Sequence, residues 1–189
     1  RDVLHPATGM KMIPVVQSPD GEFIQDTTAI IDHLEARFPA PSIYPADPVQ
    51  RLVSLLFEVL ADEWLLLPAM HYRWHYKRQN LRFILGEFGE LVEPRAPAAL
   101  RPLVGAPLAL VFGGLYKDVL GVSKTNFPAI EAWYEEVLGQ LNAHFRTHRF
   151  LLGDRPSIGD FGLIAPLYAH LYRDPYPGEI MRRVAPHVA

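Results

Sequence analysis

A proline-rich segment divides this chain into two parts of different character. Residues 39–48 hold four prolines and no hydrophobic periodicity, which is typical of a semi-rigid linker. Before this segment, short apolar runs alternate with turn signals; after it, apolar residues recur at helical spacing. We therefore expect an α+β domain at residues 1–40, a linker at 41–48 and an all-helical domain at 49–189.

Composition narrows the possible functions. The 189 residues are 49% hydrophobic, which is enough to bury a core. The formal net charge is −3 and like charges form no block, so we do not expect nucleic acid as a partner. Apolar runs such as residues 65–70 and 106–114 are shorter than the roughly 20 residues that span a membrane, so we expect no membrane segment. The chain has no cysteine, which excludes disulfides and a cysteine nucleophile within it and fits a cytoplasmic protein.

The first part has the pattern of a strand, a turn, a second strand and a helix. An apolar run at residues 12–16 is interrupted by Pro14, and a second run at 22–25 follows a strong turn signal. Because proline cannot donate to a strand ladder, we expect Pro14 at an edge, a bulge or a cis bond. Asp26 or Thr27 then caps a helix whose apolar positions recur at helical spacing.

The part after the linker has the pattern of helices throughout, and no strand pattern competes. The expected helices cover residues 49–78, 81–91, 107–120, 127–148 and 158–172, with a last one that begins near residue 178. Pro68 is expected to kink the first of them. Prolines between residues 94 and 107 make the stretch before the third helix irregular.

Four short sequence strings in the first part are more specific for one protein family than the order of its strands and helix is. MIPVV at residues 12–16, PDG at 19–21, IQDTTAI at 24–30 and HLE at 33–35 resemble the second half of the thioredoxin-like domain of glutathione S-transferases. In that family, an apolar residue followed by a cis-proline exposes main chain that pairs with the cysteinyl part of glutathione. An acidic or amide residue and a hydroxyl residue then begin the next helix. The resemblance thus implies glutathione binding by Ile13, Pro14, Asp26 and Thr27.

The physical chemistry of a helix start agrees with this implication. An N-terminus presents unpaired N–H groups and the positive end of the helix dipole, which attract a carboxylate. A neighbouring carboxylate can hold an ammonium group. Asp26 and Thr27 can therefore bind both charges of the γ-glutamyl group, or they can simply cap the helix.

A second string, LLGDRPSIGDF at residues 151–161, resembles the turn that leads into a buried helix of the family's helical domain. Ser157 is the expected N-cap, and Asp160 is its partner three residues later in a capping box. This motif supports the fold and indicates no chemistry.

The chain also departs from the family pattern. His5, Pro6 and Lys11 do not match the approach to the cis-proline, so we assign no glycyl-carboxylate contact to Lys11. The family's catalytic Tyr, Ser or Cys lies in the first strand-to-helix segment, which would precede Arg1. We therefore expect the first strand, the first helix and the unknown catalytic residue upstream of this chain.

One predicted helix carries further candidate residues. His71 and His75 are four residues apart, but a metal site would need a third ligand, and we expect no metal. In the family, this helix lines the pocket for the electrophile. The resemblance therefore implies that Met70, His71 and Trp74 contact an apolar substrate.

The resemblance implies a glutathione transferase that adds the glutathione thiolate to a small apolar electrophile. Glutathione is then a co-substrate, and no cofactor is implied. The alternative is a non-catalytic binding or scaffold protein with the same fold. The family also implies a homodimer formed through the helix before the linker and the helix that begins near Val49. The second of these helices has more apolar surface than one stripe buries, at Leu52, Leu55, Leu56, Val59 and Leu60.

Overall fold

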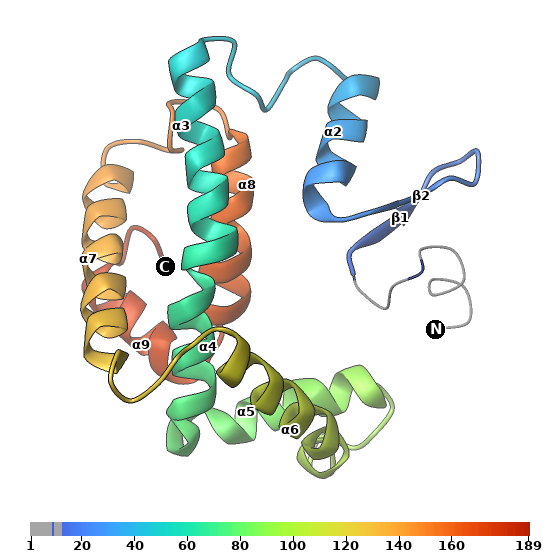
Figure 1. Ribbon diagram of the computed structural model, residues 1–189, viewed down its shortest axis with the longest axis vertical. Coiled ribbons are helices and arrows are strands. Elements are labelled where there is room, and N and C mark those ends of the chain that lie inside the picture. The colour runs from blue at the N-terminus through green and yellow to red at the C-terminus, as the bar shows by residue number, and fades with distance from the viewer. Residues whose placement is uncertain (1–8, 10–12) are drawn as a thin grey trace. The chain divides into compact units, whose positions relative to one another are not determined.

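The computed structural model describes residue 9 and residues 13–189, and the chain forms two compact units, residues 1–43 and 44–189. The first unit contains β1 (Val15–Gln17), β2 (Phe23–Gln25) and α2 (Thr27–Arg37) (Figure 1). The two strands are antiparallel, with Val16 opposite Ile24. The predicted order of strand, turn, strand and helix is confirmed. Met12, where the predicted first strand begins, lies outside the described residues, as do His5, Pro6 and Lys11.

Local hydrogen bonds explain the hairpin. The amide of Ser18 donates to the carbonyl of Glu22 at 2.9 Å, and the amide of Gly21 donates to the carbonyl of Ser18 at 2.9 Å. Gly21 has a φ of 92°, a conformation that glycine adopts without steric cost. The predicted turn therefore forms because its residue types fit the required backbone.

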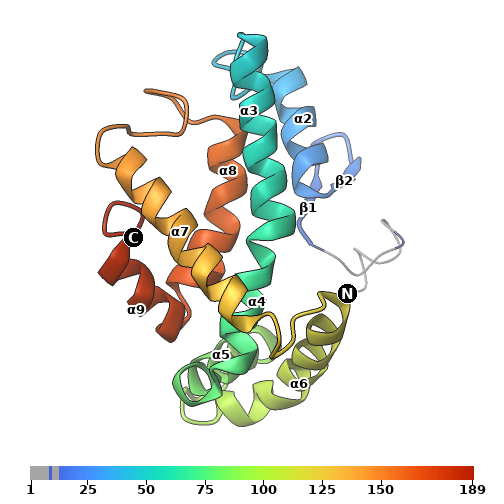
Figure 2. The ribbon, with the colours of Figure 1, turned by 60° about the vertical axis from the view of Figure 1, so that its left-hand side comes forward.

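The second unit is helical, as predicted. Its elements are α3 (Pro48–Val59), the π-helical η1 (Leu60–Trp64), α4 (Leu66–His75), α5 (Lys77–Val92), α6 (Arg101–Val119), α7 (Phe127–Phe145), α8 (Ile158–Ile164), the π-helical η2 (Ala165–Tyr172) and α9 (Pro175–Val184). In residues 44–189, all of which have a described backbone, there is no strand, only an isolated bridge between Phe150 and Gly153. α3 and α8 run side by side in both views (Figures 1 and 2).

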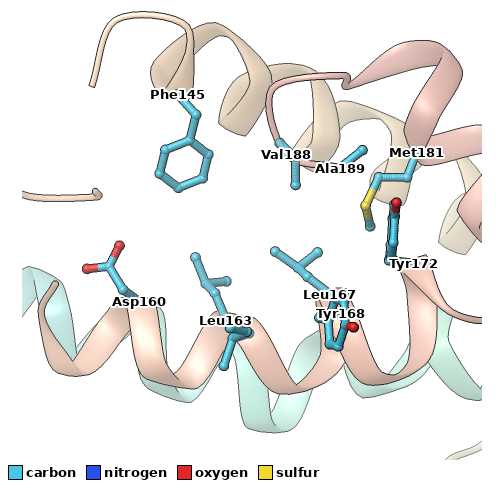
Figure 3. A pocket seen from close by; sticks show the side chains of 10 residues that line it. Phe145, Asp160, Leu163, Leu167, Tyr168, Tyr172, Met181, Val188 and Ala189 are labelled. Atoms are coloured by element: carbon cyan, nitrogen blue, oxygen red, sulfur yellow. The ribbon is translucent and has the colours of Figure 1, made fainter. Parts of the chain in front are cut away.

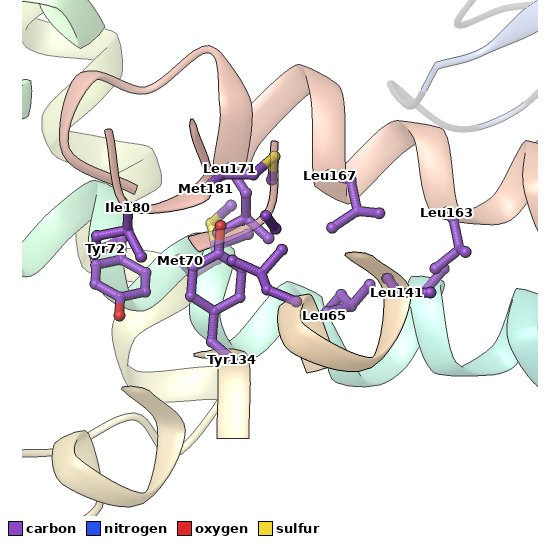
Figure 4. Packing of buried hydrophobic residues seen from close by; sticks show 14 of the residues in the cluster. Leu65, Met70, Tyr72, Tyr134, Leu141, Leu163, Leu167, Leu171, Ile180 and Met181 are labelled. Atoms are coloured by element: carbon purple, nitrogen blue, oxygen red, sulfur yellow. The ribbon is translucent and has the colours of Figure 1, made fainter. Parts of the chain in front are cut away.

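The core of the second unit collects side chains from α4, α7, η2 and α9 (Figure 4). Tyr72, Tyr134, Leu138 and Leu171 are almost completely buried. Each large apolar side chain of this kind contributes about 1.5–3 kcal/mol through its removal from water. None of the described helices is both long and apolar enough to cross a membrane.

The path of the chain is irregular next to Pro68, the position of the predicted kink. Pro68 lies in the first turn of α4, and the π-helical η1 ends at Trp64, four residues before it. A second irregularity lies at Tyr76, where a φ of −90° and a ψ of 55° separate α4 from α5. The long helix expected over residues 49–78 is therefore divided into α3, η1, α4 and the first residues of α5.

The third predicted helix begins earlier than expected. α6 starts at Arg101 and passes through Pro107 instead of beginning there. Its backbone approaches α5 closely, because a Cβ atom added to Gly105 would lie 2.2 Å from the carbonyl oxygen of Leu85 and 2.4 Å from the amide nitrogen of Gly89. This close backbone packing between α5 and α6 outweighs the local cost of the proline.

Candidate functional site

The first unit brings the two predicted glutathione-binding pairs together. The amide of Asp26 donates to the carbonyl of Pro14 at 3.3 Å. The peptide bond between Ile13 and Pro14 is cis, as expected from the resemblance. Ile13, Pro14, Asp26 and Thr27 are all exposed. The main chain before β1 and the N-terminus of α2 therefore lie side by side and face solvent.

Asp26 has an unusual backbone for its position. Its φ is 84°, and it is the only described residue other than glycine with a positive φ. Its Oδ1 accepts a hydrogen bond from the amide of Thr28 at 3.0 Å, so the side chain caps α2. Thr27 is the first residue of α2, directly after this cap.

In the second unit, α4 and α7 share a polar cluster. Nε2 of His71 lies 2.7 Å from Oε1 of Glu131, and the hydroxyl of Tyr76 donates to the same oxygen at 2.6 Å. Burial and the hydrogen bond to Glu131 raise the pKa of Tyr76 above its usual value, so its hydroxyl stays protonated at neutral pH. No local sequence pattern indicates Glu131, because its partners are 55 and 60 residues away in the chain.

The three expected substrate-pocket residues have different surroundings. All three are buried, and Met70 and Trp74 belong to the hydrophobic core. Trp74 lines a cavity of about 400 Å³ between the α4–α5 region and α6. The remaining walls include Leu81, Leu85, Ala109 and Leu110. The sequence did not point to these wall residues, although the glycine pair at 113–114 in α6 is a signal of close approach to a helix.

A smaller groove of about 230 Å³ lies where η2 faces the end of the chain (Figure 3). Leu163, Leu167 and Met181 make its walls apolar. Asp160, the acidic residue that lines this groove, accepts hydrogen bonds from the amides of Leu151 and Ser157 at 2.9 Å and 2.8 Å. Asp160 is therefore committed to the capping box of α8, as predicted, and is not available for chemistry in the groove.

Metal ligands do not gather in the part of the chain that the structure describes. No group of three His, Cys, Asp or Glu side chains is placed to hold a metal ion among those residues. His71 is instead paired with Glu131, and Nδ1 of His75 lies 3.1 Å from the carbonyl oxygen of His71. His71 therefore links α4 to α7 through Glu131.

Comparison with known proteins shows which families and structures this chain is similar to. Residues 1–42 match the family model described as the glutathione S-transferase N-terminal domain. The chain aligns with a glutathione S-transferase from Rhodospirillum rubrum F11 at a TM-score of 0.56 and 16% identity, covering 100% of this chain and 67% of that chain. No curated protein matches.

Two further solved structures are similar at a lower level. One is a glutathione S-transferase domain-containing protein from Marinobacter aquaeolei VT8, with a TM-score of 0.47, 19% identity and coverage of 100% of this chain and 73% of that chain. The other is a maleylpyruvate isomerase from Pseudomonas aeruginosa PAO1, with a TM-score of 0.42, 18% identity and coverage of 93% and 70%. Their similarity is too low to support a functional argument.

The fold is that of glutathione S-transferases, with a thioredoxin-like N-terminal part followed by a helical domain. The chain resembles this family in its N-terminal sequence and in its fold.

Proposed function

We propose that the protein is a glutathione transferase that conjugates the thiolate of glutathione to a small apolar electrophile. Glutathione binds at the edge formed by Ile13, Pro14, Asp26 and Thr27. The observation that supports this function best is the hydrogen bond between the amide of Asp26 and the carbonyl of Pro14, at 3.3 Å. It holds two exposed groups of the predicted site together, in the part of the chain that matches the family model.

Each group has a distinct role in this proposal. The main chain at Ile13 pairs with the cysteinyl part of glutathione, next to Pro14. The N-terminus of α2 and the Thr27 hydroxyl hold the γ-glutamyl carboxylate, and Asp26 holds the ammonium group. The thiolate is the nucleophile that attacks the electrophile, and no cofactor is needed.

The electrophile needs an apolar site. Of the three candidate residues, Trp74 lines the cavity beside α6, so we propose that the electrophile contacts Trp74 there. A cytoplasmic homodimer is part of the same proposal. The exposed apolar face of α3, formed by Val49, Leu52, Leu56 and Val59, supports the dimer.

The test is a calorimetric titration of glutathione into the wild type and the Asp26→Asn variant. Asparagine tolerates a positive φ and keeps a side-chain oxygen for the cap, but it removes the charge. Loss of the charge-assisted contact should weaken glutathione binding roughly 10-fold or more while the melting temperature stays unchanged. Asp20→Asn, in the exposed turn of the same unit, is the control and should leave the affinity unchanged.

Two results would contradict the proposal. If Asp26 serves only as a cap, Asp26→Asn leaves glutathione affinity at the wild-type value. If the wild type does not bind glutathione at millimolar concentration, the transferase function fails and a non-catalytic binding protein takes its place.

A further inference from the structure

The Trp74 cavity, defined by Trp74, Leu81, Leu85, Ala109 and Leu110 together with Lys77, has the size of a small-molecule site. Its volume of about 400 Å³ lies within the usual range for ligand pockets, about 300–1,000 Å³. Aliphatic side chains from α5 and α6 form most of its walls beside the indole ring. The walls therefore suit a flat or elongated apolar body.

Backbone packing keeps this space open. A Cβ atom added to Gly113 would lie 2.8 Å from Cε3 of Trp74, so α6 touches the indole ring directly at that point. At Gly114, the next residue, a Cβ atom would meet nothing within 4 Å. α6 is thus close to Trp74 at one residue and leaves free volume at the following one.

Among the described walls of the cavity, Lys77 carries a full charge. Lys77 lines it, is exposed, and is the first residue of α5. A cation there faces the positive end of the helix dipole, and Tyr76, the N-cap, makes no side-chain cap hydrogen bond. The described walls contain no acidic side chain. The apolar space therefore has a positive rim that an anion would complement.

We propose that the Trp74 cavity binds a small apolar or aromatic molecule that carries one carboxylate. Its apolar body packs against Trp74, Leu85 and Ala109, and its carboxylate lies at Lys77 and the N-terminus of α5. The identification of this ligand as the electrophile rests on the proposed transferase function. Binding of the ligand to the cavity needs no glutathione, so the cavity proposal and the transferase proposal can fail separately.

The experiment is a calorimetric titration of 1-naphthylacetate, without glutathione, into the complete protein. The uncharged analogue 2-(1-naphthyl)ethanol is titrated in parallel. The wild type should bind the carboxylate about 2- to 5-fold more tightly than the alcohol, which is the range for an exposed charge pair. Lys77→Met should remove this preference, whereas Lys124→Met, at an exposed lysine elsewhere, should leave it unchanged.

A second pair of variants tests the position of the ligand. Gly114→Leu fills the cavity from a position with free space and should weaken binding of both probes at least about tenfold, a change of about 1.4 kcal/mol. Gly139→Leu is the matched control, because a Cβ atom there also meets nothing within 4 Å and the residue does not line the cavity.

A third pair of variants separates a local loss of binding from a loss of binding caused by misfolding. Leu110 is 76% exposed at the cavity and Leu103 is 73% exposed on the same helix outside it. Leu110→Glu should weaken binding of the carboxylate by repulsion, and Leu103→Glu should not. The proposal is overturned if the wild type binds neither probe at millimolar concentration, if it does not distinguish carboxylate from alcohol, or if Gly114→Leu and Leu110→Glu both bind like the wild type.

Discussion

Arg73 and Asp174 form a buried, doubly hydrogen-bonded ion pair that joins α4 to the start of α9. Nε of Arg73 donates to one carboxylate oxygen of Asp174 and Nη2 donates to the other, both at 2.7 Å. The side chain of Asp174 is completely buried, whereas that of Arg73 is 15% exposed. Burial raises the pKa of the Asp174 carboxyl, and Arg73 opposes that rise. The pair fixes two segments that are 101 residues apart in the chain.

Asp174→Asn should cost about 3 kcal/mol of the free energy of unfolding, because it leaves the Arg73 guanidinium without its anion in a buried place. Chemical denaturation monitored by circular dichroism measures this loss. The control is Glu90→Gln, which breaks the 2.8 Å pair between Glu90 and Arg101, where the glutamate is 55% exposed. That surface pair should be worth at most about 1 kcal/mol. Equal losses in the two variants would contradict the role given to Asp174.

His170 should make stability depend on pH. Burial, with a smaller effect from Arg73, lowers the pKa of His170 from 6.5 to about 4. Above pH 6.5 the histidine is neutral in both states and has no effect. Between pH 6.5 and 4 the unfolded chain takes up a proton that the folded chain refuses, so stability falls by up to about 3 kcal/mol.

Denaturation at several pH values measures this loss. His170→Gln should flatten the profile in the window between pH 6.5 and 4. The control is His148→Gln, at an exposed histidine, which should leave the slope as in the wild type. An unchanged slope in His170→Gln would contradict the assignment.

The sequence predicted those features that depend on neighbouring residues. The hairpin, the Asp26 cap and the Ser157–Asp160 capping box each arise within a few residues, so residue types at fixed spacing suffice. The break at Tyr76 has a different origin. Asn80 is buried there and donates to the carbonyl of Tyr72 at 2.7 Å, while its Oδ1 accepts from the amide of Tyr176 at 2.9 Å.

Long-range packing explains the remaining differences in the fold and the site. The partner of Asn80 on α9 is 96 residues away, and no local pattern indicates it. Met70, His71 and Trp74 lie within five positions on one predicted helix, and sequence alone cannot show which of them lines the cavity beside α6. That difference depends on where α6 packs. The proposed glutathione-binding edge could be predicted from the sequence because the resemblance covers contiguous strings there.

The capping box of α8 should contribute more through Asp160 than through Ser157. The Asp160 carboxylate accepts from the amide of Leu151 at 2.9 Å and from both the amide and the hydroxyl of Ser157 at 2.8 Å. Asp160→Ala removes all three bonds and should cost about 2–3 kcal/mol, whereas Ser157→Ala should cost about 1 kcal/mol. Asp47→Ala, which removes one exposed bond to the amide of Gln50, is the comparison and should cost no more than Ser157→Ala. Thermal melts would contradict this order if Asp160→Ala were the mildest of the three.

The last prediction concerns the proposed homodimer. Val49, Leu52, Leu56 and Val59 are between 51% and 68% exposed and follow one another at helical spacing along α3. A two-fold interface brings the same face of both copies together, so one substitution acts twice. The double variant Leu52→Glu and Leu56→Glu places like charges opposite each other and should convert the dimer to a monomer in sedimentation at micromolar concentration. Leu103→Glu adds a charge at a leucine on α6 that is even more exposed, at 73%, and should leave the dimer intact. A wild type that sediments as a monomer, or a double variant that stays dimeric, would show that the face of α3 is not the interface.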